Sequence, residues 1–473
     1  MRDGKKIVIT YGTYDMFHYG HEALLRRAKE LGDYLIVGVT SDDFDRVRGK
    51  LNVHQSLTER MHAVEETGIA DLVIAEEYQG QKIADIRKYG VDIFAIGSDW
   101  EGKFDHLKRY CDVVYLPRTQ GVSSTALRAK ATPQLNLGIV GNDYIASRFA
   151  RECAHVSDIN VVASCAFEGQ DAAAFCAGLG KMAQDVERMD SVEELCQHVQ
   201  GVYISASPAR RAELIRTALT AGCHVLCEGP LFLSQAQGEE LYALAQERNL
   251  VLMQADKTLY LPAFERLRWL LESGAVGEIK DIRASFTQAP AWLDKTDVYQ
   301  GSFYDLASYV LLPATTFLGN DPADARLICS YEGDFCSWTK CELLYPHASA
   351  TLIAGRGMKS EGDMVITGTL GYVYVPAPWW KTDYFEIRGE DLRDTKKYYF
   401  ECAGEGHRYE AFEFMRRIHG GAAAGGADAY MPMQSKEDVL AVTRLVERFV
   451  AGDVIRLQSG AYHFGGGETV TDR

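Results

Sequence analysis

Residues 9–33 read ITYGTYDMFHYGHEALLRRAKELGD, and this stretch decides the fold of the first part of the chain. A β-branched run that ends at Gly12 is followed by a helical segment that begins near His18. The start of a helix leaves backbone N–H groups unsatisfied, with the positive end of the helix dipole behind them, so it favours an anion. His18 and His21 flank Gly20 at this point, which indicates a phosphate that takes part in a reaction.

The same alternation of strand and helix continues to about residue 130. Strand-like runs are KIVITYG, YLIVGVTS, DLVIAEE, DIFAIGSD and VVYLPRT, and helical segments such as HEALLRRAKELG and QKIADIRKYG separate them. This pattern predicts an α/β fold with a parallel sheet that is covered on both faces. Residues 1–131 are expected to form one domain of this kind, with its ligands at the carboxyl ends of the strands.

Two further domains are predicted after the short Pro-containing stretch at 131–134. At Leu135 a new series of strand, glycine and helix begins with LNLGIVGNDYIASRFARECA, and it continues to about residue 255 as a second doubly wound unit. Residues 256–473 contain strand-like runs with few long helices between them. This last domain is expected to be an open, largely antiparallel sheet, closed by a helix near 436–451.

The composition limits the kinds of partner that the protein can bind and indicates the cellular compartment in which it works. The 66 acidic residues outnumber the 50 basic ones and give a net charge of −16, which disfavours nucleic acid and requires any phosphate site to be a local basic pocket. The 11 cysteines form no C-x-x-C pair, and free thiols are typical of a reducing compartment. Without a signal peptide or a run of 18 apolar residues, a soluble cytoplasmic protein without membrane insertion is expected.

Two separated blocks of the first domain suit a nucleotide triphosphate. Around the first histidine pair, the backbone of Gly12, Thr13 and Gly20 can approach phosphate oxygens, while the two imidazoles donate hydrogen bonds. The second block, RTQGVSSTALRAK, combines a basic side chain with hydroxyl groups and N–H groups at the start of a helix. Its candidate residues are Arg118, Thr119, Ser123, Ser124 and Thr125. Taken alone, each block favours an ordinary helix cap with a surface arginine, but the two blocks at opposite ends of one α/β domain together favour the triphosphate site.

The segments GTYDMFHYGHEALLRRAKELGDYLIVGVTSDDF, GSDWEGKFDHLK and VVYLPRTQGVSST closely resemble the glycerol-3-phosphate cytidylyltransferases of the H-x-G-H nucleotidyltransferase superfamily. The resemblance covers residues 6–130. It implies transfer of CMP from CTP to a polyol phosphate, with glycerol 3-phosphate as the best candidate and CDP-glycerol and pyrophosphate as products. It also implies a role in the synthesis of surface polymers, and Mg²⁺ that is held mainly by the triphosphate, without a dedicated metal ligand in the protein.

The resemblance assigns roles to individual residues of this sequence. His18 and His21 match the pair that stabilises the transition state, and Lys50 and Arg118 are the other catalytic candidates, although Arg48 is an alternative to Lys50. The resemblance also assigns Tyr14 and Asp15 to the nucleotide-binding site. The residues implied to bind the acceptor substrate are Asp15, Arg60, Asp99, Trp100 and Lys103.

Residues 135–453 resemble the Gfo/Idh/MocA oxidoreductases, in which a Rossmann domain precedes an open-sheet substrate domain. The segments LGIVGNDYIASRFA, TALTAGCHVLCEGPL, LESGAVGEI and YDLASYVLLPATTFLG carry this resemblance, and Asp305 with Tyr309 matches the substrate-site pair of the family. The dinucleotide loop, however, has Asp143 two residues after Gly141, where the family has its second glycine.

Three further positions depart from the same family pattern. In CEGPL, Glu228 is retained but Gly229 replaces the catalytic lysine of the E-K-P motif. Cys165 stands where an arginine is common, and Arg211 replaces the histidine of a P-x-x-H pattern. These departures predict weak or absent NAD(P) binding and a degenerate oxidoreductase site.

Three hypotheses for the whole chain follow. The favoured one is a cytidylyltransferase whose second half is an oligomerisation or substrate-binding platform without redox activity. The second is a bifunctional enzyme with an active NAD(P)-dependent sugar or sugar-phosphate oxidoreductase, in which Lys257 replaces the missing lysine. The third makes the second half a sensor or partner-binding module. A homodimer or a higher homo-oligomer is expected, because both families commonly form one.

Overall fold

The structure is a computed structural model of the chain. It describes residues 4–41, 44–45, 53, 55, 57–78, 80–117, 134–141, 143–156, 158–166, 175, 178–179, 184–291, 293–400, 402, 404–419 and 434–457. The chain divides into two compact units. The first comprises Met1–Leu137, Arg148–Val162 and Phe400–Met415, and the second comprises Gly138–Ser147, Ala163–Tyr399 and Arg416–Arg473.

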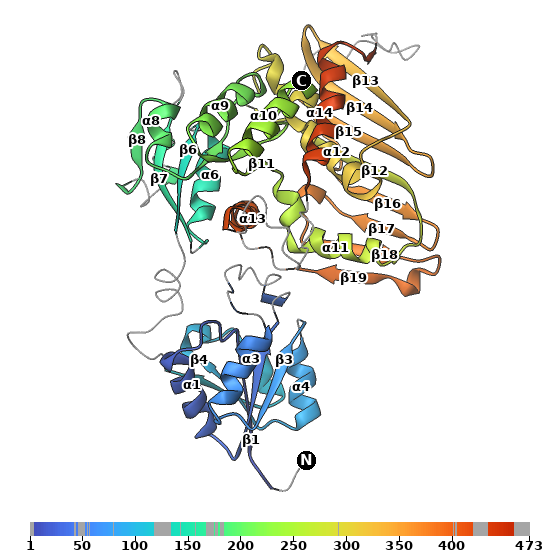
Figure 1. The fold of residues 1–473 in the computed structure, drawn as a ribbon. Coiled ribbons are helices and arrows are strands. Elements are labelled where there is room, and N and C mark those ends of the chain that lie inside the picture. Colours follow the sequence, from blue (N-terminus) through green and yellow to red (C-terminus); the bar gives the residue numbers. More distant parts are fainter. Residues whose placement is uncertain are drawn as a thin grey trace. The chain divides into compact units, whose positions relative to one another are not determined.

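A five-stranded parallel sheet is the centre of the N-terminal segment (Figure 1). Its strands lie in the order β3-β2-β1-β4-β5. The strands are β1 (Ile7–Gly12), β2 (Tyr34–Thr40), β3 (Leu72–Glu76), β4 (Ile93–Gly97) and β5 (Asp112–Leu116). The helices are α1 (Tyr19–Lys29), α3 (Leu57–Glu66) and α4 (Gln81–Tyr89), with 3-10 turns at η1 (Ser98–Trp100) and η2 (Asp105–Arg109).

Alternate residues of β1 enter two different cores, because successive side chains of a strand point to opposite faces of the sheet. Val8 packs in one cluster with Leu25 of α1. Ile7 and Ile9 pack in the other cluster with Ile86 of α4. Both faces of the sheet are therefore covered, as the apolar strand runs predict.

The second sheet has six strands in the order β11-β10-β9-β6-β7-β8, which is the 3-2-1-4-5-6 order of a Rossmann fold. Its strands are β6 (Leu135–Val140), β7 (Ile159–Cys165), β8 (Glu187–Met189), β9 (Gly201–Ile204), β10 (His224–Glu228) and β11 (Leu252–Ala255). The helices between them are α6 (Tyr144–Cys153), α8 (Val192–Cys196), α9 (Pro208–Thr220) and α10 (Gln235–Glu247). The order places β6 beside β9 at the point where the chain reverses direction across the sheet.

The third sheet has nine strands in the order β19-β18-β17-β16-β12-β15-β14-β13-β20. They are β12 (Ile279–Gln288), β13 (Asp324–Glu332), β14 (Phe335–Leu344), β15 (Ser349–Arg356), β16 (Met364–Gly368), β17 (Tyr372–Val375), β18 (Tyr384–Arg388), β19 (Lys396–Tyr399) and β20 (Ile455–Arg456). The helices are α11 (Pro262–Glu272), α12 (Ser302–Phe317), α13 (His407–His419) and α14 (Lys436–Val450), with 3-10 turns at η4 (Lys257–Tyr260), η5 (Val298–Gln300), η6 (Trp379–Lys381) and η7 (Leu392–Asp394).

The predicted fold class is confirmed. The third sheet is mixed, since β12 pairs with β15 and β13 with β20 in parallel, while the other neighbouring strands with a printed register run antiparallel. Helix α12 packs on β12, β14 and β15 and also contacts α14. Among the described residues, no helix is both long and apolar enough to cross a lipid bilayer.

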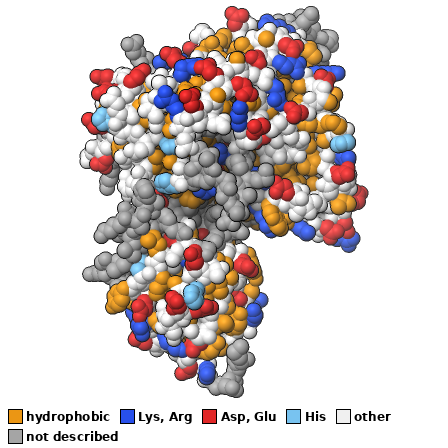
Figure 2. Space-filling model, viewed as in Figure 1, with side chains coloured by type: hydrophobic (Ala, Val, Ile, Leu, Met, Phe, Trp, Pro, Cys, Tyr) orange, Lys and Arg blue, Asp and Glu red, His pale blue; other side chains and the backbone are white. Residues whose placement is uncertain are grey.

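Surface charge of both signs is visible on the drawn face of the molecule. Figure 2 shows carboxylate side chains interspersed with basic ones on this face. The net charge of −16 is thus not gathered into one patch on the face that the figure shows. The exclusion of nucleic acid as a partner stays a prediction.

Candidate functional site

Two predicted site segments follow neighbouring strands of the first sheet. The loop with the paired histidines follows β1, and the loop with Asp99, Trp100 and Lys103 follows β4. Strands β1 and β4 are adjacent, and the chain turns to β2 on one side of β1 and reaches β4 on the other. Such a switch point opens a crevice at the carboxyl ends of the strands, where α/β proteins bind their ligands.

The first histidine caps helix α1. The backbone of His18 is extended (φ −143°, ψ 170°), and its Nδ1 accepts a hydrogen bond from the N–H of Gly20 at 3.0 Å. An Nδ1 atom that accepts cannot carry the proton of the neutral ring, so Nε2–H is the remaining donor. The ring of His21 stacks on that of His18 with centroids 3.9 Å apart and an angle of 15°. The two imidazoles therefore lie together at the start of the helix.

The loop that precedes this cap is strained. Tyr14 and Met16 have φ values of 55° and 48°, in the left-handed region that residues other than glycine rarely adopt. Gln55 contacts this loop twice, because its Oε1 accepts the N–H of Met16 at 2.7 Å and its own N–H donates to Asp15 Oδ1 at 3.1 Å. Strain of this kind persists only where surrounding contacts fix the backbone.

Arg60 of α3 also fixes this loop. Its guanidinium donates to the carbonyls of Thr13 at 2.6 Å, Thr40 at 2.7 Å and Gln55 at 2.9 Å. It also lies 3.7 Å from the carboxylate of Asp45, and both side chains are fully buried. Arg60 is predicted to help bind the phosphate of the acceptor substrate. Arg60 joins the ends of two strands to the loop, and a direct contact with substrate stays a prediction.

Replacing Arg60 with alanine is expected to lower the free energy of unfolding by about 3–5 kcal/mol, because Asp45 and three carbonyls would lose a buried partner. Urea unfolding followed by circular dichroism measures the change. The matched control is Arg26→Ala, whose partner Glu22 lies on the same exposed helix face and whose loss should change stability by no more than about 0.5 kcal/mol. Equal stability of the two variants would contradict the assigned role of Arg60.

The other predicted residues of this loop are also enclosed. Thr13 is 6% exposed and its hydroxyl donates to Asp45 Oδ1 at 2.9 Å, while Asp15 is 2% exposed. Tyr14 packs in the core with an edge-on contact to His21, and burial is the main cause that raises its pKa above the ordinary range. The side chains of this loop thus build the scaffold, and the backbone of Gly12 and Gly20 remains the predicted phosphate contact.

The predicted acceptor-binding residues are more exposed. Trp100 is 37% exposed, and the ammonium of Lys103 lies 5.1 Å from the centroid of its ring. The ring of Phe104 lies 5.8 Å from the same indole and connects it to the core residue Phe94. Asp99 precedes Trp100 on the same turn and is exposed. A cation held over an exposed indole can meet an anionic ligand without moving the scaffold.

Several predicted residues lie outside the described residues. They are Arg48, Lys50, Arg118, Thr119, Ser123, Ser124 and Thr125. Strand β5 ends at Leu116, two positions before Arg118, so the chain enters this block from the same edge of the sheet. Their catalytic and nucleotide-binding roles stay predictions.

The second unit contains the degenerate dinucleotide loop. Gly141 has a φ of +107°, and a Cβ atom there would lie 2.1 Å from the carbonyl oxygen of Ser205, so only glycine fits. Asp143 Oδ1 accepts the N–H of Ala146 at 2.7 Å, and Oδ2 accepts the hydroxyl of Ser205 at 2.7 Å. The carboxylate of Asp143 therefore occupies the N-terminus of α6, where a Rossmann fold binds the pyrophosphate of its cofactor.

The position of the missing lysine is tightly packed. A Cβ atom at Gly229 would lie 2.7 Å from Gln254 Cδ and 2.7 Å from Ser308 Oγ. Arg211, which replaces the expected histidine, is buried and donates to the carbonyls of Ala206 and Pro230, both at 2.9 Å. These contacts give the altered positions structural functions of their own.

Glu228 belongs to this altered motif, and the charges of Lys257 and Arg211 both influence its pKa. Burial raises the pKa of Glu228 to about 7, while a hydrogen bond from the hydroxyl of Tyr203 and the charge of Lys257 act in the opposite direction. Lys257 is 6% exposed in η4. A role of Lys257 in proton transfer stays a prediction.

Asp305 and Tyr309 lie one turn apart on α12. Asp305 forms an ion pair with Arg356 of β15, and Arg356 also donates to Gln288 Oε1 at 2.7 Å. Burial lowers the pKa of Arg356 to about 10. The ring of Tyr309 packs edge-on against Phe286 at 5.6 Å. The two predicted residues thus lie on one helix, with an arginine bound to the carboxylate of Asp305, and their role in substrate binding stays a prediction.

Sequence reasoning missed four residues of these sites. They are Asp45 and Gln55 in the first unit and Ser205 and Arg356 in the second. Each acts through contacts with residues that are distant in the chain, and single positions of this kind leave no mark in periodicity or composition. For Ser205 alone a signal existed, since it follows β9, the neighbour of β6 at the switch point.

The parallel sheet and the two histidines at the N-terminus of α1 define a nucleotidyltransferase domain. Residues 9–130 match the cytidylyltransferase-like family. A glycerol-3-phosphate cytidylyltransferase of Bacillus spizizenii is 53% identical over 123 residues, which are 26% of this chain and 95% of that protein. Through this domain the chain belongs to the cytidylyltransferase-like family.

Residues 135–255 match the oxidoreductase family with an NAD-binding Rossmann fold. A dTDP-3,4-didehydro-2,6-dideoxy-alpha-D-glucose 3-reductase of Actinomadura kijaniata is 32% identical over 211 residues, which are 44% of this chain and 62% of that protein. The solved structure of a 3-ketoreductase from the same organism, in complex with NADP and TDP-benzene, has a TM-score of 0.58 at 23% identity and covers 69% of this chain and 100% of that one. This likeness shows the fold.

Proposed function

We propose that the N-terminal domain transfers CMP from CTP to glycerol 3-phosphate, forming CDP-glycerol and releasing pyrophosphate. One observation carries the proposal: the domain is 53% identical to a glycerol-3-phosphate cytidylyltransferase over 95% of that protein. The stacked His18 and His21 at the start of α1 supply the donors that this chemistry requires.

The reaction is an in-line displacement at the α-phosphorus of CTP. A phosphate oxygen of the acceptor attacks, the new P–O bond forms, and the bond to the bridging oxygen of pyrophosphate breaks. Negative charge grows on the leaving group and on the transferred phosphoryl oxygens. His18 Nε2–H and the N–H groups at the start of α1 are fixed before the reaction, so they stabilise this charge without reorganising.

The donor set of the first site fits Mg²⁺ that is carried mainly by the triphosphate. Asp15 Oδ1 already accepts the N–H of Gln55, and Asp45 Oδ1 accepts the hydroxyl of Thr13. These carboxylates hold the scaffold, so the phosphate oxygens of CTP would supply most ligands. When bound, the ion neutralises charge on the triphosphate.

The acceptor is proposed to lie beside η1, where Lys103 and Trp100 meet. The ammonium of Lys103 supplies charge for the phosphate of the acceptor, and the partly exposed indole of Trp100 supplies a surface for its carbon chain. Longer alditol phosphates need only a roomier pocket, and for this reason the test below uses a panel of acceptors.

We further propose that the second half performs no redox chemistry and serves as a platform for oligomerisation or substrate binding. Asp143 at the pyrophosphate position and the packed Gly229 support this proposal. The second candidate function is an active NAD(P)-dependent sugar oxidoreductase. It is favoured by a single observation, the buried Lys257 beside Glu228.

The test is product detection by mass spectrometry with the full chain, CTP, Mg²⁺ and a panel of polyol phosphates that includes glycerol 3-phosphate. Each reaction is run with and without NAD(P)H. We expect CDP-glycerol to form at the same rate in both series. If a product formed only from a keto-sugar phosphate together with NAD(P)H, the oxidoreductase would be active and the proposal for the second half would be wrong.

A further inference from the structure

Two free cysteines of the hairpin formed by β13 and β14 lie on the same face of the third sheet. Cys329 pairs with Thr339, and Cys336 pairs with Tyr331, which is two residues after Cys329. Residues two apart in a strand share a face with each other and with their cross-strand partners. A register shift separates the two pairs, so Cys336 and Thr339 share this face although they are three residues apart. The two thiols are hydrogen-bonded to each other.

Cys336 is surrounded by hydrogen-bond donors. Its Sγ lies 3.3 Å from Oγ1 of Thr339 and 3.5 Å from Oγ of Ser302, the first residue of α12. As a thiol, Cys336 donates to the carbonyl of Trp338 at 3.6 Å. As a thiolate, it accepts from the two hydroxyl groups and from the thiol of Cys329. The positive end of the α12 dipole lies beside this sulfur and also favours a thiolate.

These contacts outweigh the effect of burial on the charge of Cys336. The hydrogen bond from Cys329 is the main cause that lowers the pKa of Cys336, and burial acts in the opposite direction. For Cys341, which is buried on the same strand, burial instead raises the pKa to about 12. Cys336 is therefore the cysteine of this hairpin that most readily becomes a thiolate, the form that attacks oxidants.

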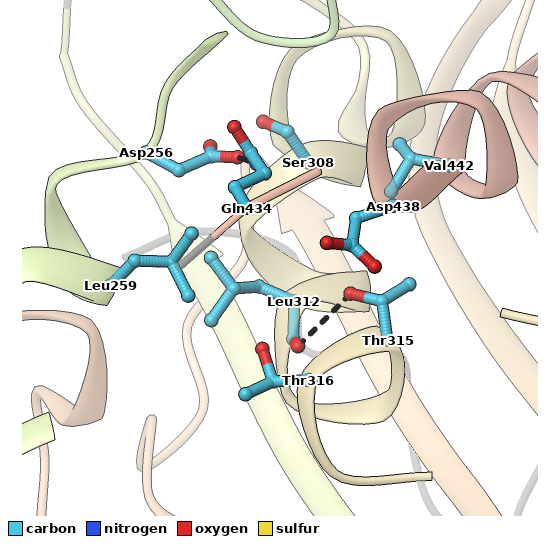
Figure 3. Close-up of a pocket in the computed structure, with 9 residues that line it drawn as sticks. All are labelled: Asp256, Leu259, Ser308, Leu312, Thr315, Thr316, Gln434, Asp438 and Val442. Carbon is cyan, nitrogen blue, oxygen red and sulfur yellow. Dashed lines mark hydrogen bonds between the residues drawn. The ribbon is translucent and has the colours of Figure 1, made fainter. Parts of the chain in front are cut away.

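A second buried polar group beside α12 favours its neutral form. Figure 3 shows Asp256, Ser308 and Gln434 at the wall of a small cavity. Gln434 donates to Asp256 Oδ2 at 2.6 Å. Burial raises the pKa of Asp256 although its hydrogen bonds with neighbouring side chains act in the opposite direction. Of these two groups, Cys336 is thus the one whose contacts favour a reactive anion.

Cys336 lies near the exposed turn of its hairpin. It is the second residue of β14, and the turn before this strand contains the exposed residues Gly333 and Asp334. Segments with few buried contacts open locally at a low free energy. In the closed hairpin the side chain of Cys336 is 2% exposed, so a reagent close to water in size is favoured over a larger one. Hydrogen peroxide meets this requirement.

We propose that Cys336 and Cys329 form a peroxide-sensitive dithiol, which hydrogen peroxide converts to an intramolecular disulfide. The thiolate sulfur of Cys336 attacks one peroxide oxygen, the O–O bond breaks, and the hydroxide that leaves is protonated to water. Cys336 is then a sulfenic acid. The sulfur of Cys329 attacks that of Cys336 while its proton moves to the departing oxygen, so the S–O bond breaks and a second water leaves. Two sulfurs are oxidised, and one peroxide is reduced to two waters.

The test is peptide mapping of the full chain after exposure to hydrogen peroxide under native conditions. Free thiols are then alkylated in denaturant, and the chain is cleaved with trypsin. Cleavage after Arg326 and Lys340 releases residues 327–340, which contain Cys329 and Cys336 as their only cysteines. We expect this peptide to lose both alkyl groups and to weigh two hydrogen atoms less than the reduced peptide, whereas Cys341 in the next peptide stays alkylated. Dithiothreitol should restore both thiols.

Variants identify the role of each sulfur. In Cys329→Ser, Cys336 should stop at the sulfenic acid, which dimedone labels in the same peptide. In Cys336→Ser, oxidation of Cys329 should slow about 10-fold or more, because the sulfur that reacts first is absent. Cys341→Ser is the matched control and should form the disulfide at the rate of the unchanged chain.

Three outcomes would overturn the proposal. The first is a peptide 327–340 of the unchanged chain that keeps two alkylated thiols after peroxide treatment. The second is oxidation of Cys341 at the same rate, which would assign the reaction to unfolded chains. The third is oxidation of Cys329 at an unchanged rate in Cys336→Ser, because Cys336 would then not be the attacking sulfur. None of these outcomes depends on cytidylyltransferase activity.

Discussion

Replacing His18 or His21 with alanine is expected to lower kcat for CDP-glycerol formation about 100-fold or more. Each variant removes an imidazole that is held in place before the reaction, His18 by its hydrogen bond to Gly20 and His21 by stacking on His18. Removal of one preorganised hydrogen-bond donor to a developing oxyanion typically lowers kcat by about 100-fold to 1000-fold. The KM for CTP should change much less, because the donor acts mainly on charge that develops in the transition state.

The matched control is His62→Ala on α3, whose ring is exposed and pairs with Glu66 at the surface. Steady-state kinetics with CTP and glycerol 3-phosphate, together with thermal unfolding of each variant, separate lost chemistry from lost folding. Unchanged kcat in both His18→Ala and His21→Ala would remove the proposed mechanism. A fall in kcat that the His62 variant shares would indicate a general effect of the substitutions.

Replacing Asp143 with glycine is expected to raise the affinity for NADPH about 10-fold or more. The carboxylate already accepts the N–H of Ala146 at the start of α6 and the hydroxyl of Ser205, and its charge repels the pyrophosphate. Removal of a repulsion of about 1.4 kcal/mol corresponds to that factor. The same change removes the cap of α6, so we also expect stability to fall by about 1 kcal/mol.

Asp143→Asn separates the two causes, because it removes the charge while keeping a side chain that can cap the helix. We expect its affinity to lie between those of the unchanged chain and the glycine variant. Titration of NADPH fluorescence measures all three proteins. Tight binding of NADPH by the unchanged chain would contradict the role given to Asp143 and would support an active oxidoreductase.

The elements that the sequence predicts well are those governed by local pattern. The β-branched runs become β1, β2, β3, β4 and β5, and His18 caps α1 because its position before an amphipathic run already specifies a helix start. The Rossmann strand order follows from the same alternation of strand and helix.

Other features depend on contacts between distant segments and therefore escaped prediction. The resemblance assigns Arg60 to the acceptor site, but its full burial and its contact with Asp45 depend on the folded loops. For Asp143 the sequence predicts a repelled cofactor, but the carboxylate's hydrogen bonds to Ala146 and Ser205 require the folded loop. Gln55 gives no pattern at all, since its two contacts with the strained loop are set by tertiary structure.

The packing around Gly229 also limits how this chain can change over evolutionary time. A lysine introduced there would meet Gln254 and Ser308 at its first side-chain carbon, so one substitution would damage the fold before it could restore catalysis. Redox chemistry could be restored only if Gln254 and Ser308 were replaced by smaller residues before the lysine appeared. Those earlier substitutions would bring no catalytic gain by themselves. The present packing around Gly229 therefore makes a return of the catalytic lysine less accessible than further divergence of the second half.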